Sequence, residues 1–323
     1  MTAALELLAA VHQGDRRALA KAITLVESTR AEDRAASRDL LSGLGSGEAN
    51  ALRIGVTGVP GAGKSTLIDA LGLCAIQSGR RVAVLAVDPS SRDGGGSVLG
   101  DKTRMTRLTA EARAFVRPSP TSGVLGGTAR RTREAIALCE AAGYDVIFVE
   151  TVGVGQSEER VASMVDSVLL LLLAGAGDDI SSMKRGVLEA ADVIAFNKAD
   201  GAGLAPAQAD AAALRASLGI SRAHTAPEVL LVSALEGSGT DELWQALEAH
   251  QAKLGSSGQL AERRRAQRRD WFDAAVDDVL RDLLAQPDAL AQRESSERAV
   301  MAGQAAPYDA AERFVGALFA RRH

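Results

Sequence analysis

The stretch from Gly58 to Thr66 has the residue types and spacing needed to bind phosphate. It reads Gly58-Val59-Pro60-Gly61-Ala62-Gly63-Lys64-Ser65-Thr66 and matches the pattern GxxxxGK[ST]. Glycines allow backbone N–H groups to surround phosphate oxygens at the start of a helix, Lys64 would reach the β- and γ-phosphates, and Ser65 would hold Mg²⁺. The alternative is a glycine-rich turn before an ordinary helix, but an apolar run before the stretch and a helical pattern after it supply the expected context. The stretch therefore predicts nucleoside triphosphate binding.

A second motif bears on which base is bound. Asn197-Lys198-Ala199-Asp200 follows an apolar run and looks like the NKxD element of GTPases. In such proteins the aspartate accepts hydrogen bonds from N1–H and the exocyclic amine of guanine, whereas adenine would leave that carboxylate badly paired. Ser233-Ala234-Leu235, after the next apolar run, resembles the second guanine-contacting loop. A surface turn would explain the first motif alone, but its place after the phosphate loop favours guanine over adenine.

Three acidic residues, two of them at predicted strand ends, are candidates for binding Mg²⁺. Asp88 directly follows the apolar run at 82–87, and a carboxylate beside the phosphate loop can orient water or hold the metal. Asp101 lies in a glycine-rich stretch, where a closing loop would bring its carboxylate to the metal; a helix cap is its alternative role. Glu150 ends the run at 145–149, and a solvated position at a strand end is its alternative.

Two further loops are candidates for sensing or transferring the γ-phosphate. Gly153, in the loop after Glu150, would let a peptide N–H reach the γ-phosphate, and loss of that phosphate would release the loop. Lys184 and Arg185 follow the glycine-containing turn at 175–177. These cations would stabilise charge on the transferring phosphoryl group or, equally well, face a partner or solvent. The candidate catalytic residues are thus Lys64, Asp88, Asp101, Glu150 and Lys184.

These candidates lie near the ends of apolar runs that predict the strands of one sheet. The runs are continuous rather than alternating, as in a parallel sheet covered on both faces, and helical segments separate them. They cover residues 54–57, 82–87, 114–116, 146–149, 168–174, 193–196 and 229–232. The expected fold is α/β, with a doubly wound, mainly parallel sheet as the P-loop core. Helical patterns flank it and define three regions: an N-terminal helical extension at 1–47, the P-loop domain at 48–254 and a C-terminal helical region at 255–323.

The composition argues against several classes of protein. The 323 residues carry 37 basic and 41 acidic side chains, a net charge of −4, so nothing draws the whole chain to nucleic acid or membrane. The longest uncharged apolar run, 168–176, is far shorter than the ~20 residues of a membrane span. Two cysteines suit a reducing cytosol, and a cytoplasmic protein is expected. The basic cluster Arg263–Arg269 is balanced by acidic neighbours, which favours a solvated or interfacial helix face over RNA binding.

Taken together, these segments resemble the MeaB/ArgK family, in the SIMIBI class of P-loop GTPases. The similarity covers nearly the whole chain, and the segments at 95–105 and 150–158 are specific to that family among GTPases. The matching segments are 14–28, 58–66, 88–91, 95–105, 122–127, 150–158, 175–178, 197–200 and 233–235.

The resemblance implies a Mg²⁺-dependent GTPase that chaperones an adenosylcobalamin-dependent acyl-CoA mutase such as methylmalonyl-CoA mutase. Family members couple GTP hydrolysis to loading of the cobalamin cofactor and to protection or rescue of the mutase. The resemblance also implies a homodimer formed through the C-terminal helices, here 258–323. By position, Asp88, Asp101 and Glu150 match the family's Mg²⁺ and switch carboxylates, and Lys184 matches a lysine of its third switch.

The third switch departs from the family pattern. That segment usually reads roughly Asp-Glu-Leu-Gln-Gly-Ile-Lys, whereas this chain has Asp178-Asp179-Ile180-Ser181-Ser182-Met183-Lys184. Because this loop is linked to partner response, the identity of the mutase stays open. Its substrate could be isobutyryl-, 2-hydroxyisobutyryl- or ethylmalonyl-CoA instead.

Two other functions fit a phosphate loop. One is a protein kinase or ATPase acting on periplasmic amino-acid-binding transport proteins, an older assignment for the family that needs a membrane-side partner. The other is a GTPase that inserts metal into hydrogenase or urease, a class that carries Cys and His metal sites. Here Cys74, Cys139 and the four histidines have no ligand-like spacing.

Overall fold

The computed structural model of the protein describes residues 3–28, 30, 32–45, 50–87, 105–117, 127–151, 161–175, 185–221 and 226–320. Contacts divide the chain into two compact units, Met1–Arg265 and Ala266–His323. The first unit contains a β-sheet with its flanking helices, and the described part of the second unit is helical.

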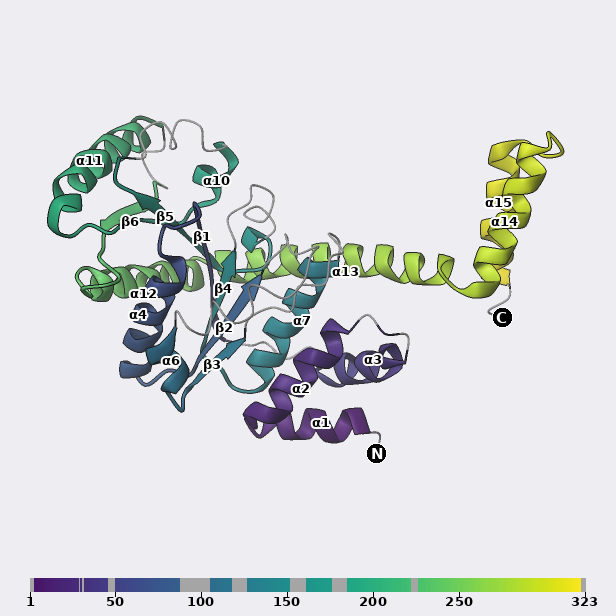
Figure 1. Ribbon diagram of the computed structural model, residues 1–323, viewed down its shortest axis with the longest axis horizontal. Helices are drawn as coiled ribbons and strands as arrows, with labels where there is room; N and C mark the ends of the chain where they lie inside the picture. The colour runs from purple at the N-terminus through teal and green to yellow at the C-terminus, as the bar shows by residue number, and fades with distance from the viewer. Residues whose placement is uncertain are drawn as a thin grey trace. The chain divides into compact units, whose positions relative to one another are not determined.

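The first unit is built on a parallel sheet. In the described part of the chain this sheet has seven strands in the order β3-β2-β4-β1-β5-β6-β7, and neighbouring strands are parallel (Figure 1). The strands are β1 (Leu52–Gly58), β2 (Val82–Val87), β3 (Ala114–Arg117), β4 (Val146–Thr151), β5 (Ser167–Leu173), β6 (Val193–Asn197) and β7 (Glu228–Leu231). Each apolar run predicted from the sequence forms one of these strands, so the predicted doubly wound α/β fold is confirmed.

The direction of strand addition reverses at β1. This strand pairs with β4 on one side and with β5 on the other, so later strands extend the sheet both ways. In doubly wound sheets, ligands bind outside the carboxyl ends of the strands at such a point. The phosphate loop follows β1 directly and therefore lies where a ligand is expected.

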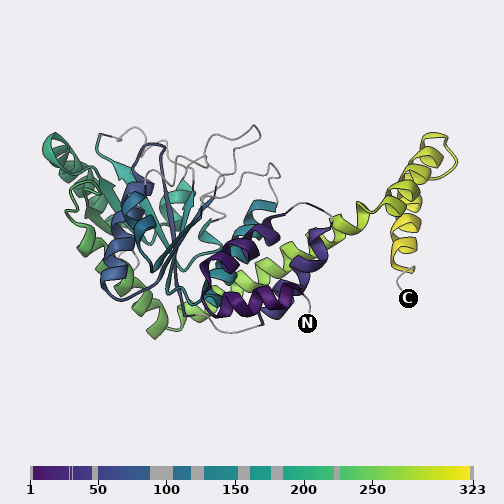
Figure 2. The ribbon, with the colours of Figure 1, turned by 60° about the horizontal axis from the view of Figure 1, so that its bottom comes forward.

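Helices cover both faces of the sheet, which explains why its strands are apolar throughout. Along β5, Leu169 and Leu171 share a buried cluster with helices α4 and α12, whereas Leu170 and Leu172 are buried with α10 and α11 on the opposite face. Figures 1 and 2 show α4 and α12 on the side of the sheet away from α7. These helices are α4 (Lys64–Gln77), α6 (Thr106–Ala110), α7 (Gly127–Ala141), α10 (Arg185–Ala190), α11 (Leu204–Ser221) and α12 (Thr240–Ser256), and a 3₁₀ turn (Gly201–Gly203) precedes α11.

The N-terminal helices pack against α7. Leu8, Leu19 and Ile23 are buried in one apolar cluster with Leu138 of α7. The carboxylate of Asp15 caps the second helix by accepting hydrogen bonds from the backbone N–H groups of Ala18 at 3.0 Å and Arg17 at 2.7 Å, and these bonds lower its pKa. The three helices are α1 (Ala3–His12), α2 (Arg16–Glu27) and α3 (Asp33–Gly43).

The C-terminal helices carry many exposed apolar side chains. Helix α13 (Gln259–Leu284) begins in the first unit and continues into the second, where α14 (Pro287–Met301) and α15 (Pro307–Ala320) contact each other. The exposed large apolar residues of the second unit are Phe272, Val276, Val279, Leu280, Leu290, Met301, Tyr308, Val315 and Phe319. Among the helices that the structure describes, none combines the length and apolar character needed to cross a bilayer.

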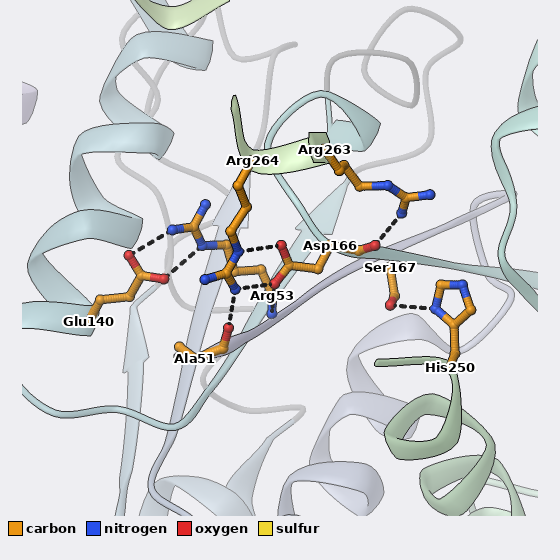
Figure 3. A network of polar contacts seen from close by, with 8 residues as sticks. All are labelled: Ala51, Arg53, Glu140, Asp166, Ser167, His250, Arg263 and Arg264. Carbon is orange, nitrogen blue, oxygen red and sulfur yellow. Dashed lines mark hydrogen bonds and ion pairs between the residues drawn. The ribbon is translucent and has the colours of Figure 1, made fainter. Parts of the chain in front are cut away.

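A network of charged residues joins the start of α13 to the amino ends of β1 and β5 (Figure 3). Asp166, whose side chain is fully buried, accepts hydrogen bonds from Nε and Nη2 of Arg264 at 2.9 and 2.6 Å. Arg264 Nη2 also donates to the carbonyl oxygen of Ala51 at 2.6 Å, and the backbone N–H of Arg53 donates to Asp166 at 3.1 Å. One buried carboxylate therefore holds both the helix and the first strand.

Neighbouring ion pairs extend this network. The guanidinium of Arg53 donates to both carboxylate oxygens of Glu140 on α7, at 2.7 and 2.9 Å. Arg263 donates to both oxygens of Asp192, the residue before β6, at 3.1 and 3.2 Å. The first two arginines of the predicted basic cluster thus bind carboxylates of this protein itself, as an interfacial helix face does.

His250 of α12 lies beside these pairs. Its Nδ1 is hydrogen-bonded to Ser167 Oγ at 2.8 Å (Figure 3), and its Nε2 lies 3.4 Å from Asp192. Burial lowers the pKa of His250, although the carboxylate of Asp192 acts in the opposite direction. The imidazole is therefore neutral at neutral pH, and Arg263 supplies the positive charge that Asp192 faces.

Candidate nucleotide-binding site

The phosphate loop connects β1 to α4 at the carboxyl edge of the sheet. Gly58 ends β1, and α4 begins at Lys64. A Cβ at Gly58 would lie 2.3 Å from the carbonyl oxygen of Leu171, and one at Gly63 would lie 2.5 Å from Nδ2 of Asn197. Both glycines also have positive φ angles, 144° and 90°. Only glycine tolerates both a positive φ angle and so close an approach of neighbouring atoms. The two glycines therefore allow the loop to pack tightly against β5 and Asn197.

Lys64 lies at the start of α4 and lines a pocket. Its Nζ donates to the carbonyl oxygens of Gly58 at 2.8 Å and Val59 at 3.2 Å, and the side chain is buried. The pocket has a volume of about 470 Å³, within the usual range of small-molecule sites. It is lined by Pro60, Gly61, Gly63, Lys64, Ser65, Thr66, Ala86, Glu150, Thr151 and Lys198.

Ser65 and Glu150 are far apart in the sequence but meet in this pocket. Ser65 Oγ donates to Glu150 Oε1 at 2.7 Å, and both side chains are buried. The pairing of β1 with β4 causes this contact, because Val56 lies opposite Glu150 just before the phosphate loop. A hydroxyl and a carboxylate are oxygen donors of the kind Mg²⁺ prefers, so the two residues fit the metal site predicted for them.

Asn197 connects the phosphate loop to the predicted base-binding loops. Its Nδ2 donates to the carbonyl oxygen of Ala62 at 2.7 Å, and its Oδ1 accepts from the backbone N–H of Ala234 at 3.1 Å. The side chain is only 2% exposed. Because both ends of the amide bind backbone groups of different loops, Asn197 holds these loops in a fixed relation.

The two predicted base-binding motifs lie side by side. Ser233 Oγ donates to Asp200 Oδ2 at 2.5 Å and accepts from the backbone N–H of Glu236 at 3.2 Å. Lys198 adopts a left-handed backbone conformation, with φ 60°, and lines the pocket. Leu235 is 84% exposed. The tertiary structure thus brings Asp200, Ser233 and the phosphate loop to one edge of the sheet.

Several predicted site residues lie outside the described residues, namely Asp88, Asp101, Gly153 and Lys184. The strand before Asp88 nevertheless ends close to the pocket. Val87, the last residue of β2, lies opposite Thr151 of β4, and Ala86 lines the pocket. The chain therefore leaves β2 beside Glu150.

Two further residues line the pocket but were not among the predicted site residues. Thr151 is fully buried, and its Oγ1 donates to Thr57 Oγ1 on β1 at 3.2 Å. Its place directly after Glu150, at the same strand end, is the signal that points to it. Nothing in the sequence distinguishes Ala86 from the other apolar residues of β2.

Comparisons with known proteins agree with this geometry. The family described as methylmalonyl Co-A mutase-associated GTPase MeaB matches residues 19–288. A protein of Mycobacterium tuberculosis named Probable GTPase is 50% identical over 313 residues, which cover 96% of this chain and 93% of that protein. The mitochondrial protein of Mus musculus named methylmalonic aciduria type A homolog is 42% identical over 325 residues, covering 96% and 78%.

A solved structure shows the same fold over nearly the whole chain. It is described as the crystal structure of LAO/AO transport system kinase and has a TM-score of 0.73 at 37% identity, covering 97% of this chain and 96% of that one. The family match extends well beyond the phosphate loop, and relatives of high identity are named as GTPases. The chain therefore belongs to the MeaB/ArgK family of SIMIBI-class P-loop GTPases, and it is a GTPase that binds guanine nucleotide.

Proposed function

We propose that this GTPase requires Mg²⁺ and chaperones an adenosylcobalamin-dependent acyl-CoA mutase, methylmalonyl-CoA mutase or a close relative. GTP hydrolysis would be coupled to loading of the cobalamin cofactor and to protection or reactivation of the mutase. The observation that carries the proposal is the match to a mutase-associated GTPase family over residues 19–288, which includes most of helix α2 and all of α13. We also propose a cytoplasmic location, because the charge balance and the two cysteines suit a reducing compartment.

The phosphate loop and the two base-binding motifs each have a role in this proposal. The backbone N–H groups of Gly58–Thr66 bind phosphate oxygens at the N-terminus of α4. Lys64 exchanges its loop carbonyls for the β- and γ-phosphates. Asp200, oriented by Ser233, accepts hydrogen bonds from guanine, and Asn197 keeps the base-binding loops against the phosphate loop.

The metal site of the proposal is formed by oxygen ligands. Ser65 and Glu150, together with Asp88 and Asp101, would hold Mg²⁺. When bound, Mg²⁺ neutralises negative charge that develops on the phosphates. Gly153 would donate its N–H to the γ-phosphate, and Lys184 would stabilise the transferring phosphoryl group.

The mutase proposal is tested by measuring phosphate release from GTP with and without purified acyl-CoA mutases. The correct mutase is expected to accelerate hydrolysis by roughly tenfold or more, equivalent to about 1.4 kcal/mol of activation free energy. Lys64→Ala is expected to abolish both basal and stimulated hydrolysis, which shows that this pocket is responsible. If methylmalonyl-CoA mutase and its acyl-CoA relatives neither bind the protein nor change its rate, the proposal is wrong.

A protein kinase acting on amino-acid-binding transport proteins is the second candidate, because a similar solved structure is described as a transport system kinase. Hydrolysis and kinase activity both break the bond to the γ-phosphate, but the acceptor is water in one case and a protein side chain in the other. Incubation with γ-labelled GTP and a periplasmic binding protein separates them. Label released as free phosphate supports the GTPase chaperone, and label retained on the binding protein supports the kinase.

We further propose that the protein is a homodimer formed through its C-terminal helices. Val276 follows Phe272 on α13 by four residues, and Val279 and Leu280 follow Val276 by three and four, so the four side chains share one face of the helix. All four are exposed, with Phe272 at 67%. A row of exposed large apolar side chains on a helix is typical of a surface that another chain covers.

Replacing both Phe272 and Val279 by aspartate is expected to convert the dimer to a monomer, because two unpaired charges would be buried in an apolar interface. Size-exclusion chromatography with light scattering measures the change. Leu204→Asp is the matched control, since Leu204 is an exposed apolar residue of the first unit, at 41%. A wild-type monomer, or a double variant that stays dimeric, contradicts the proposal.

A further inference from the structure

Two buried threonines meet beside the pocket, and neither is among the predicted site residues. Thr57 is the residue before Gly58 on β1 and is 1% exposed, and Thr151 ends β4 and is fully buried. The hydroxyl of Thr151 donates to Thr57 Oγ1 at 3.2 Å, and the carbonyl oxygen of Val56 is the alternative acceptor at 3.4 Å. The pair therefore joins the strand that leads into the phosphate loop to the strand that carries Glu150.

This bond lies where the pairing of the two strands ends. Val56 lies opposite Glu150 in the last pair of the β1–β4 register, so Thr57 and Thr151 come one residue further on. One residue after Thr57, β1 ends at Gly58, and β4 ends at Thr151 itself. A side-chain bond thus continues the connection between the two strands to the edge of the sheet at which the pocket lies.

The hydroxyl of Thr151 lies on the face of the sheet opposite to the carboxylate of Glu150. Successive side chains of a strand alternate between the two faces. Phe148 of β4 is buried in the cluster with α4, and Val149 is buried in the cluster with α7. Glu150 continues the first series and reaches Ser65 on α4, whereas Thr151 continues the second. The hydroxyl pair therefore stands behind Glu150 and bears on its carboxylate through the backbone of β4.

Burial alone does not favour hydroxyl groups at these two positions. Valine has nearly the same shape as threonine, and a buried hydroxyl costs free energy unless it is hydrogen-bonded. Replacing both partners of a buried hydrogen bond by apolar groups of the same shape is nearly neutral or stabilising. Stability therefore does not account for the pair, whereas a directional bond fixes how the two strand ends lie relative to each other.

We propose that Thr151 and Thr57 are positioning residues of the metal site: their hydroxyl bond fixes the end of β4 against β1 and so keeps the carboxylate of Glu150 at Ser65. The inference rests on the proposed Mg²⁺-dependent function. Mg²⁺ demands ligand distances close to about 2.1 Å, so a small displacement of the strand end weakens its binding. Binding of the guanine base is unaffected, because Asp200 follows a different strand, β6.

The test uses the full-length protein with GDP bound and Mn²⁺ in place of Mg²⁺, because EPR detects free Mn²⁺ directly. Thr151→Val is expected to raise the Kd of Mn²⁺ about tenfold, at the lower end of the effects of residues that orient metal ligands. Thr57→Val leaves the carbonyl oxygen of Val56 as an acceptor and should have a smaller effect. Thr151→Ser keeps the hydroxyl and should retain most of the wild-type affinity. The Kd of GDP in EDTA should not change in any of these variants.

The double variant Thr57→Val/Thr151→Val separates positioning from stability. Thr151→Val alone leaves the Thr57 hydroxyl without its partner and should lower Tm, whereas the double variant removes both hydroxyls and should melt close to wild type. The double variant is still expected to bind Mn²⁺ about tenfold more weakly than wild type. If it regains the wild-type Mn²⁺ affinity together with the wild-type Tm, the pair is merely structural and the inference is wrong.

Thr109→Val is the matched control, since it removes another threonine hydroxyl bond, from Thr109 Oγ1 to the carbonyl oxygen of Met105 at 2.6 Å within α6. It should leave the Kd of Mn²⁺ unchanged, and an increase as large as that of Thr151→Val contradicts the inference. If Thr151→Val does not fold, the double variant decides. A wild-type GDP complex that binds no Mn²⁺, together with GTP hydrolysis that is equally fast in EDTA, overturns the proposed metal-dependent function itself, which is a distinct result.

Discussion

Replacing Asp200 by alanine is expected to abolish the preference for guanine over adenine nucleotides. Two hydrogen bonds from guanine to a charged carboxylate contribute about 1.5–3 kcal/mol each, so their loss should weaken GDP binding by roughly 100-fold or more. The geometry supports a strong effect, because Ser233 Oγ holds the carboxylate of Asp200 at 2.5 Å next to the loop that Asn197 ties to the phosphate loop. ADP binding should change little, since its base has no matching donors.

The measurement is the Kd of GDP and of ADP for wild type and for Asp200→Ala, by displacement of a fluorescent nucleotide. Glu236→Ala is the control, because Glu236 is an exposed acidic residue of the neighbouring loop and its removal changes net charge equally. It should leave the ratio of the two constants unchanged. If Asp200→Ala keeps the wild-type ratio of the Kd of ADP to the Kd of GDP, guanine is recognised by other groups.

The second large effect is expected on stability, from Asp166→Ala. Removing this carboxylate breaks the ion pair with the guanidinium of Arg264, whose side chain is 12% exposed, and also removes an acceptor for the backbone N–H of Arg53. Breaking a buried pair in this way lowers the free energy of unfolding by about 3–5 kcal/mol. The start of α13 also loses one of the bonds that hold it to the sheet, so the effect is larger than for a single surface contact.

Urea denaturation and thermal melting measure this loss. For a domain of this size each kcal/mol corresponds to roughly 2–4 °C in Tm. The control is Glu297→Gln, which breaks the Arg293–Glu297 pair at 3.0 Å, where both side chains are about 60% exposed. An exposed pair of this kind contributes at most about 1 kcal/mol, so the two variants should differ clearly. Equal losses in the two variants would mean that the Asp166–Arg264 pair does not carry the stability assigned to it.

Several elements of the site were predictable because their patterns are local. The apolar runs identify the strands, since a parallel sheet with helices on both faces needs side chains such as Leu169 and Leu170 to be apolar in succession. The phosphate loop was predictable because its glycines serve backbone conformations and close approaches, as at Gly58 and Gly63. The proposed guanine specificity likewise follows from a short motif at a strand end.

Other elements depend on pairings between distant residues, which no local pattern encodes. The basic cluster at 263–269 illustrates this limit. Its charges alone are compatible with solvent, a partner or RNA, and the binding of Arg264 to Asp166 follows only from the packing of α13 on the amino ends of the strands. The contact of Asp69 on α4 with Arg107 and Leu108 on α6 has the same origin, because these partners lie 38 and 39 residues further along the chain.

The sequence by itself thus determined the fold class, the family resemblance, the phosphate loop and the candidate residues, since each depends on residue types within a few positions of one another. Only the tertiary structure decided which of those residues touch. It placed Ser65 against Glu150, made Asn197 the link between the phosphate loop and Ala234, and turned Arg263 and Arg264 onto internal carboxylates. The physical reason is that strand order and register, rather than distance along the chain, set which side chains meet at each edge of a parallel sheet.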